Sequence, residues 1–156
     1  LGINSKILSS ALTIAIAQRL VRRLCPKCGT KTAATEAERA TIRKVLETIP
    51  PARLPSALPA MESLTLTRAG ACDACHKTGF KGRIGVFEAI IMDKEVERAT
   101  EESPNERGIK EAARPQEILD MRQDGVLKVL GGVTTLEEVE RVVAVQEVQG
   151  IQAMNL

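Results

Sequence analysis

The chain has 156 residues, of which 44% are apolar, and a formal net charge of +2 at pH 7. This composition supports one ordinary domain or two small ones around a hydrophobic core, and it excludes a disordered segment. Phe80 and Phe87 are the only residues of the Phe, Tyr and Trp types, so the chain cannot build the aromatic platforms on which single-stranded nucleic acids stack.

We expect neither a membrane span nor a signal peptide at the beginning of the chain. Residues 7–17 form the longest mostly apolar stretch, far below the roughly 20 residues that cross a bilayer. No basic segment precedes this stretch and the chain opens at Leu1 without Met, so we expect no signal peptide and a cut inside a longer protein. Residues 1–35 contain six basic residues and no acid, a pattern also compatible with contact to nucleic acid or lipid.

Two interpretations fit the first 24 residues. Apolar residues from Ile7 to Leu24 recur at helical spacing, which predicts one helix after an N-cap at residue 4 or 5. The rival interpretation ends the helix near Leu12, because β-branched residues alternate over 13–17 as they do in a strand. Periodicity does not decide between the two.

Four cysteines form two pairs, Cys25 with Cys28 and Cys72 with Cys75, with 43 residues between them. Two thiolates at positions i and i+3 of a tight turn point to one side, and two such turns facing each other form a closed tetrahedral zinc site. Six basic residues flank the pairs and can balance the charge of a zinc tetrathiolate; they are Arg22, Arg23, Lys27, Lys31, Lys77 and Lys81. The sequence therefore predicts one zinc ion held by all four cysteines.

Three other roles for this region are less well supported. Two disulfides require an oxidising compartment, which a chain without an export signal does not indicate. A redox dithiol would need a cysteine that reacts without a metal. His76 adjoins Cys75 and offers a further ligand atom, but four cysteines complete a zinc shell and an adjacent residue points away, so we expect an exposed histidine.

The segment between the cysteine pairs has three parts. Thr35 and Glu38 have the spacing of a capping box, followed by apolar residues at helical spacing, which predicts a helix over 36–49. Residues 50–60 contain four prolines and should be irregular. Residues 64–67 alternate between apolar and polar, which predicts a short strand.

A strand and then several helices are predicted after the second cysteine pair. Residues 83–91 are apolar on both alternating faces, which predicts a buried strand after a turn at 79–82. Asp93 can cap a helix over 94–100, and residues 106–113 form a second short helix. The part after Phe80 carries enough aliphatic residues for a core of its own, so we expect a zinc ion to clip a long loop rather than to hold the whole fold.

Two further helices end the chain. One is predicted over 116–130 after Pro115, with Gly125 inside it; glycine costs about 1 kcal/mol there relative to alanine, which implies close packing. Thr135 and Glu138 form a second capping box for the last helix. The tail from residue 150 is expected to fray.

Catalytic motifs are absent from these 156 residues. No Gly-x-x-x-x-Gly-Lys-[Ser/Thr] phosphate loop occurs, and the single histidine has no serine or cysteine partner placed by a motif. We therefore do not expect the chain to be an enzyme by itself.

Several motifs together resemble one family. The runs AQRLVRRLCPKC (residues 17–28) and GACDACHKTGFKGRIGVFE (residues 70–88) are similar to the C-terminal region of the GspE/PilB-type secretion ATPases, as are DGVLKV (124–129) and GVTTLEEV (132–139). The resemblance covers residues 1–143, except that the loop over 29–71 has no close match.

The resemblance implies an α+β fold. The chain would be the C-terminal subdomain of a RecA-like ATPase, with a zinc-binding insertion between two antiparallel strands and a mostly helical remainder. It favours a helix over 4–12 and a strand over 13–23. The implied division is the end of the ATPase core at 1–24, the tetracysteine insertion at 25–82, a strand with a helical subdomain at 83–149, and a tail at 150–156.

The same resemblance implies a structural role in a motor. The parent would be a cytoplasmic hexamer that drives type IV pilus assembly or type II protein secretion, and its ATP and Mg²⁺ would bind outside this chain. The partners would be the rest of the ATPase, neighbouring subunits and an inner-membrane platform protein, with no nucleic acid. The alternative is a free-standing tetracysteine zinc ribbon that binds nucleic acid or an adaptor.

Overall fold

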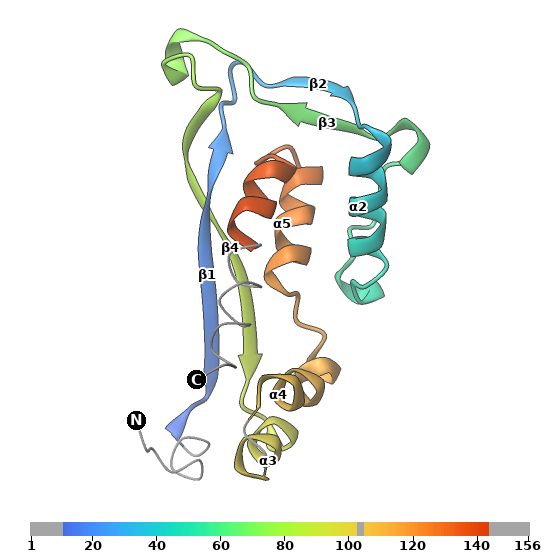
Figure 1. Ribbon diagram of the computed structural model, residues 1–156, viewed down its shortest axis with the longest axis vertical. Helices are drawn as coiled ribbons and strands as arrows, with labels where there is room; N and C mark the ends of the chain where they lie inside the picture. Colours follow the sequence, from blue (N-terminus) through green and yellow to red (C-terminus); the bar gives the residue numbers. More distant parts are fainter. Residues whose placement is uncertain (1–10, 103–104, 144–156) are drawn as a thin grey trace.

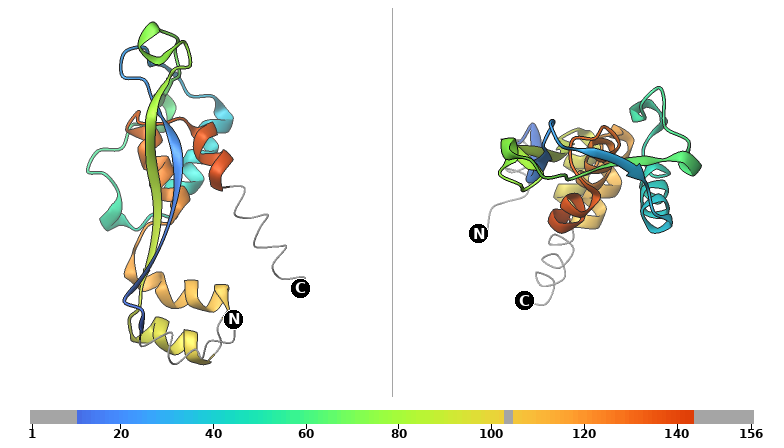
Figure 2. Two further views of the ribbon diagram at one scale, coloured as in Figure 1. Left: turned by 90° about the vertical axis from the view of Figure 1, so that its left-hand side faces the viewer. Right: turned by 90° about the horizontal axis from the view of Figure 1, so that it is seen from above.

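The computed structural model describes residues 11–102 and 105–143. Its longest feature is an antiparallel pair of strands, β1 (Ile14–Leu24) and β4 (Phe80–Ile91), which we call the ladder (Figure 1). Helices α3 (Lys94–Glu102) and α4 (Glu106–Ala113) lie together at one end of the ladder, and the loops that carry the cysteines lie at the other (Figures 1 and 2). The mixture of helices and antiparallel strands confirms the predicted α+β class.

The remaining elements are shorter. In chain order they are β2 (Thr30–Ala33), α2 (Glu36–Leu46), the 3₁₀ turns η1 (Pro51–Arg53) and η2 (Met61–Ser63), β3 (Thr65–Arg68), the 3₁₀ turns η3 (Asp73–Cys75) and η4 (Arg114–Gln116), and α5 (Met121–Leu130). Residues 136–143 are also helical. β2 and β3 pair in a second antiparallel sheet. The sequence predicted β3 but not β2, because the polar residues of β2 are exposed along its whole length.

Residues 14–24 are a strand and not a continued helix. Their register runs from Ile14 opposite Ile91 to Leu24 opposite Phe80, with an irregularity after Arg22. This long pairing with β4 overrides the helical spacing of the apolar residues, because helical spacing over so few residues is a weak preference. The predicted helix over 4–12 falls almost entirely outside the described residues.

The ladder is buried on one face, so the prediction that β4 is buried on both faces is wrong. Val21 and Val86 are fully buried under the helices, whereas Phe87 and Ile91 are each 45% exposed. β4 also begins at Phe80, so the predicted turn at 79–82 is shorter than expected. The first error arises because apolar composition does not show whether a second layer covers the strand.

One hydrophobic core joins segments that precede and follow the second cysteine pair, and no described residue of α3 or α4 belongs to it. Ladder residues, α5 and the helix over 136–143 pack together with residues of α2, the helix between the cysteine pairs; the α2 side chains in this core are Ile42, Val45 and Leu46. The Gln123 side-chain amide on α5 also donates to the Thr48 carbonyl oxygen at 2.9 Å, just after α2. The expectation that the part after Phe80 has a core of its own is therefore wrong.

Helix boundaries agree with the capping signals more closely than with the apolar spacing. The Thr35–Glu38 capping box is present and starts α2, which ends at Leu46 rather than at residue 49. α5 begins at Met121 rather than at residue 116, because Asp120 and Gln123 form a capping box of their own. Helices α3 and α4 agree with the predicted segments, with α3 two residues longer.

The last described segment runs beside β1. The Leu24 N–H donates to the Val133 carbonyl oxygen at 2.9 Å, and the Thr134 hydroxyl donates to the Arg22 carbonyl oxygen at 2.8 Å. The helix over 136–143 then begins with half of its predicted capping box, since the Glu138 N–H donates to the Thr135 hydroxyl at 3.4 Å. The Glu138 carboxylate binds Arg22 instead of returning to the cap. The tail from residue 150 lies outside the described residues.

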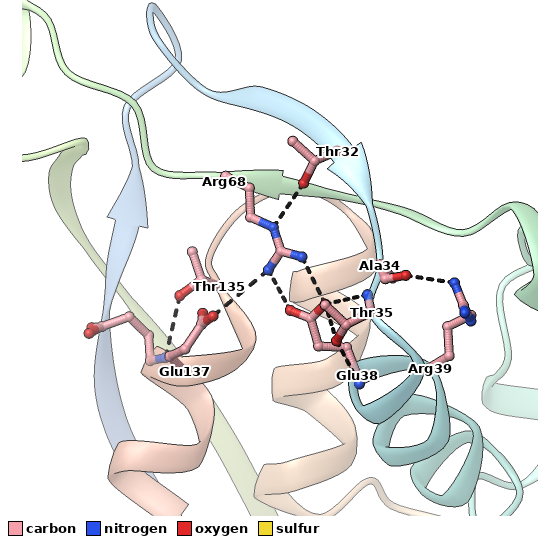
Figure 3. A network of polar contacts seen from close by, with 9 residues as sticks. Thr32, Ala34, Thr35, Glu38, Arg39, Arg68, Thr135 and Glu137 are labelled. Atoms are coloured by element: carbon pink, nitrogen blue, oxygen red, sulfur yellow. Dashed lines mark hydrogen bonds and ion pairs between the residues drawn. The ribbon is translucent and has the colours of Figure 1, made fainter.

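Arg68 on β3 joins the small sheet to two helices (Figure 3). Its guanidinium donates to the Thr32 hydroxyl at 3.0 Å and to Glu38 on α2 through two nitrogens, one of them at 2.8 Å, and lies 3.8 Å from the Glu137 carboxylate. These hydrogen bonds from Arg68 are the main reason that the pKa of Glu38 falls to about 2. Arg68 thus fixes the loop between the cysteine pairs onto the core.

Candidate metal centre

The first cysteine pair follows directly from the ladder. The Cys25 N–H donates to the Gly79 carbonyl oxygen at 2.9 Å, and the Gly29 N–H returns to the Cys25 carbonyl oxygen at 3.3 Å, so the chain reverses around Cys28. Gly70 passes so close to this turn that a Cβ there would lie 1.9 Å from the Cys28 carbonyl oxygen. A glycine is therefore required for the two cysteine turns to approach each other.

The second pair lies on the turn η3. The N–H groups of Cys75 and Lys77 both donate to the Cys72 carbonyl oxygen, at 3.3 and 2.9 Å. His76, Lys77 and Gly79 have positive φ angles of 50°, 61° and 77°. This tight left-handed path aims the Gly79 N–H at the Cys75 Sγ, 3.2 Å away. The backbone thereby donates a hydrogen bond to a sulfur, as outer-shell groups do for metal ligands.

The two turns bring the four predicted ligand sulfurs together. The Sγ atoms lie 3.9 Å apart between Cys25 and Cys72, 3.7 Å between Cys28 and Cys75, and 3.6 Å between Cys72 and Cys75, and all four lie within 4.8 Å of one another. Sulfurs about 2.3 Å from a tetrahedral Zn²⁺ are separated by about 3.8 Å. The spacing of the sulfurs therefore fits a single four-coordinate cation. All four thiols are free rather than joined in disulfides.

The thiols ionise unequally. Burial opposes ionisation of Cys75, but hydrogen bonds with the backbone of Cys72 and Gly79 and with neighbouring thiols outweigh it and lower its pKa to about 6. Burial, together with hydrogen bonds to the other three thiols, raises the pKa of Cys28 to about 12. The cluster alone therefore does not hold four thiolates at neutral pH, whereas a divalent cation among the sulfurs would deprotonate them all.

The charged residues around the sulfurs fall into two groups. Arg22 lies over the Phe80 ring at 4.1 Å from its centroid and pairs with Glu138, and Lys77 pairs with Asp73 at 2.8 Å. The other flanking basic residues are exposed; they are Arg23, Lys27, Lys31 and Lys81. His76 is exposed and outside the sulfur cluster, as expected.

Sequence reasoning missed the part that Glu138 plays beside the centre. Its side chain is 3% exposed, and hydrogen bonds from Arg22 and then Arg141 outweigh its burial and lower its pKa to about 2. The available signal was an acid between Leu136 and Val139, both buried, since a buried carboxylate needs a partner. The sequence could not name the partner, which lies 116 positions away.

Comparison with known proteins gives matches that cover most of the chain, including the cysteine turns and the ladder. The model of the family described as "Type II/IV secretion system protein" matches residues 1–141. The chain is 38% identical to the type II secretion system protein E of Pseudomonas aeruginosa and 36% identical to that of Aeromonas hydrophila, in both cases over 142 residues that make up 91% of this chain. It is 32% identical over 139 residues, 89% of the chain, to the type IV pilus assembly ATPase PilB of Thermus thermophilus.

The matched relatives are much longer than this chain. The match covers 25% of each of the two type II proteins and 14% of the Thermus thermophilus protein. The cysteine turns and the ladder therefore correspond to a limited part of those proteins.

Proposed function

Because this chain belongs to the type II/IV secretion system protein family, we propose that it is the zinc-binding C-terminal module of a hexameric ATPase that drives type IV pilus assembly or type II protein secretion. The observation that carries the zinc assignment is the spacing of the four sulfurs, which is 3.6 to 3.9 Å between Cys25 and Cys72, Cys28 and Cys75, and Cys72 and Cys75. Thiolate ligands in a closed shell of four are typical of structural zinc.

The zinc ion would act as a structural cross-link through Cys25, Cys28, Cys72 and Cys75. It leaves no open coordination position for a substrate, so its chemistry is to hold two turns together. The two pairs enclose 43 residues, and closing a loop of that length stabilises a fold by about 4 kcal/mol by the chain-entropy relation for cross-links. The ion would thereby close the cysteine end of the ladder.

The exposed face of the ladder supports contact with the rest of the ATPase. Five large apolar side chains lie on this face and are between 45% and 63% exposed; they are Ile14, Ile16, Leu20, Phe87 and Ile91. Contiguous exposed apolar surface marks an interaction site. Since the match covers a quarter or less of these relatives, we propose that the nucleotide-binding part of the longer protein covers this face.

We also propose a division of the chain into four parts. Residues 1–24 would complete the ATPase core, 25–82 form the tetracysteine insertion, 83–149 form the strand and helical subdomain, and 150–156 form the tail. The last boundary lies outside the described residues.

Nucleotide chemistry would belong to the longer protein. ATP and Mg²⁺ would bind there, because these 156 residues contain no phosphate loop. The module would transmit ATP-driven movement to neighbouring subunits and to an inner-membrane platform protein, in the cytoplasm at the membrane surface and without contact to nucleic acid. Within the described part of the chain, no helix has the length and apolarity needed to span a membrane.

Native mass spectrometry of chain purified without added metal tests the zinc assignment. We expect one zinc ion per chain, loss of that ion in Cys75→Ser, and full retention in His76→Ala, the matched control on the same turn. Four freely titrating thiols and no metal in the unmodified chain would contradict the assignment.

The ATPase assignment has a separate test. The coding sequence upstream of Leu1 should encode a Gly-x-x-x-x-Gly-Lys-[Ser/Thr] loop. A natural start codon directly before Leu1 would favour the free-standing zinc ribbon instead.

A further inference from the structure

The outer edge of β1 is the side of the strand that faces away from β4. Hydrogen-bonded and non-hydrogen-bonded residue pairs alternate along an antiparallel ladder, and residues of the second kind direct their N–H and carbonyl groups outward. Arg22 is such a residue, because its N–H donates to Glu138 rather than to β4. The register is regular from there back to the start of the strand. The same orientation therefore holds at every second residue, which are Leu20, Gln18, Ile16 and Ile14.

The outer edge of β4 confirms this alternation independently. Phe87 and Ile91 lie opposite outward-directed residues of β1, so their own N–H groups should also point outward. The Phe87 N–H donates to the Asp124 Oδ2 atom and the Ile91 N–H donates to the Gln116 Oε1 atom, each at 2.9 Å. The Gln116 Nε2 atom also donates to the Ile91 carbonyl oxygen at 2.7 Å. Side chains thus take the place of a neighbouring strand at these positions of β4.

The outer edge of β1 is sealed near the cysteine turns and open along the rest. Residues 133–138 bind the backbone groups of Arg22 and Leu24. Within the described part of the chain, no hydrogen bond uses an outward N–H group over residues 14–20, and the one contact to an outward carbonyl oxygen comes from the neighbouring Arg19 side chain. We call residues 14–20 of β1 the open edge.

The open edge lacks the features that protect natural edge strands. Such strands usually carry several charges, a proline or a bulge. The open edge reads IAIAQRL, with one basic residue and no proline, and its register with β4 is regular. Its side chains Ile14, Ile16 and Leu20 are 45%, 63% and 50% exposed. A regular apolar edge of this kind is a template for pairing with a further strand.

The other face of the same stretch is also incompletely covered. A cleft of about 520 Å³ lies between the ladder and the segment that joins α4 to α5, and its apolar lining includes Ala15, Ala17, Ile90 and Leu119. A strand inside a sheet that is packed between two layers is covered on both faces. The open edge lacks full cover on either face, whereas Val21, farther along the same strand, is fully buried.

We propose that a strand from the nucleotide-binding part of the longer protein pairs with the open edge and extends the ladder into a larger sheet. This inference rests on the proposed function and names the contact through which that part meets this chain. Outward N–H and carbonyl groups at every second residue match the backbone of an extended segment.

The longer protein is favoured over a second copy of this chain as the source of the strand. The matched relatives extend well beyond this region, since the match covers 25% or less of each. A segment of the same protein also meets the edge at a higher effective concentration than a second molecule does.

Residue-level amide hydrogen exchange tests the pairing by comparing the longer protein with the 156-residue chain. We expect the outward N–H groups of Ile16, Gln18 and Leu20 to exchange at least about tenfold more slowly in the longer protein, because a backbone hydrogen bond protects an amide. The Arg22 N–H is the internal control, since Glu138 binds it within this chain. Equal exchange rates of the three amides in the two proteins would overturn the proposal.

Proline substitutions separate strand pairing from simple burial of the apolar face. Gln18→Pro removes an outward N–H and no bond of the ladder, whereas Arg19→Pro, the matched control, removes a bond to β4. Gln18→Pro should leave the melting temperature of the 156-residue chain nearly unchanged and lower that of the longer protein. Arg19→Pro should lower both. A longer protein that keeps its melting temperature with Gln18→Pro would overturn the proposal.

Two further outcomes distinguish this pairing from its alternatives. Protection of the open edge in the 156-residue chain that increases with protein concentration would assign the edge to a second copy and overturn the proposal. A phosphate loop upstream of Leu1, combined with unprotected amides at the open edge of the longer protein, would refute the pairing and leave the ATPase assignment intact.

Discussion

Glu138 binds Arg22 twice, although 116 positions separate them. Its carboxylate accepts one hydrogen bond from the Arg22 backbone N–H at 2.9 Å and one from the guanidinium at 2.7 Å. The first of these satisfies an N–H on the outer edge of β1, and the second neutralises an arginine three residues before Cys25. The last described helix is thereby fixed to the strand that leads into the cysteine turns.

Replacing Glu138 by Gln should lower the free energy of unfolding by about 2 kcal/mol at pH 7. A buried ion pair that loses one partner costs more than this, but Arg22 is half exposed and water compensates part of the loss. Chemical denaturation measures the effect. Glu137→Gln is the matched control, because the Glu137 side chain is 69% exposed and its ion pair with Arg68 is long, at 3.8 Å. This substitution should change the free energy of unfolding by less than about 0.5 kcal/mol.

The same pair predicts a dependence on pH. The folded pKa of Glu138, about 2, lies below its ordinary value of 4.5, so its contribution is complete above pH 4.5 and disappears as the pH falls toward 2. The stability difference between the unmodified chain and Glu138→Gln should therefore shrink over that interval. A stability difference that stayed constant down to pH 2 would show that the ionised carboxylate of Glu138 is not the source of the stabilisation.

Gly125→Ala should destabilise the fold by about 1 to 3 kcal/mol, the usual cost of overpacking a core. A Cβ at this position of α5 would lie 2.5 Å from the Val139 Cγ1 atom. Thermal denaturation should show a lower midpoint for Gly125→Ala and partial recovery when Val139→Ala is added. Gly131→Ala is the control, since its Cβ would meet nothing closer than 3.5 Å; equal losses at both glycines would refute the packing explanation.

Arg68→Lys should destabilise the chain by about 1 kcal/mol. A lysine keeps the charge but cannot donate to Thr32 and Glu38 with the fixed fork of a guanidinium. A double-mutant cycle with Glu38→Gln, read by denaturation, should give a coupling energy between positions 68 and 38. Full additivity of the two single substitutions would mean that the contact in Figure 3 contributes nothing to stability.

Removing the metal should loosen the cysteine end and leave the core intact. With chelator, trypsin should cut first after Lys27, Lys31, Lys77 or Lys81, because these positions flank the cysteine turns. Sites on α2, such as Arg43 and Lys44, should stay protected since this helix packs in the common core. Mass spectrometry of a digestion time course identifies the cuts. Early cleavage on α2 would show that the metal is needed for the whole fold.

Local signals in the sequence predicted much of this structure. The cysteine spacing predicted which sulfurs come together, and the Thr35–Glu38 capping box predicted the start of α2, because both signals act within a few residues. The β1 segment illustrates the limit of such signals. Its apolar residues fit a helix equally well, and only the resemblance to a known family favoured the strand that pairs with β4 over 55 intervening residues.

Features that depend on residues far apart in the sequence were not predicted. β2 is polar and exposed, and its only reason to be a strand is pairing with β3. The burial of β4 on one face and the sharing of one core by α2 and α5 depend on how layers stack, which no single segment encodes. The role of Glu138 likewise depends on Arg22, far away along the chain.

The ladder has a mechanical consequence. At the rise of an extended strand, the eleven residues of β1 make the ladder an arm about 35 Å long. A tilt of about 5° at the end near α3 would displace the cysteine turns by about 3 Å, as follows from the length of the arm. A small rotation at one end of the chain thus becomes a shift as large as a hydrogen bond at the other.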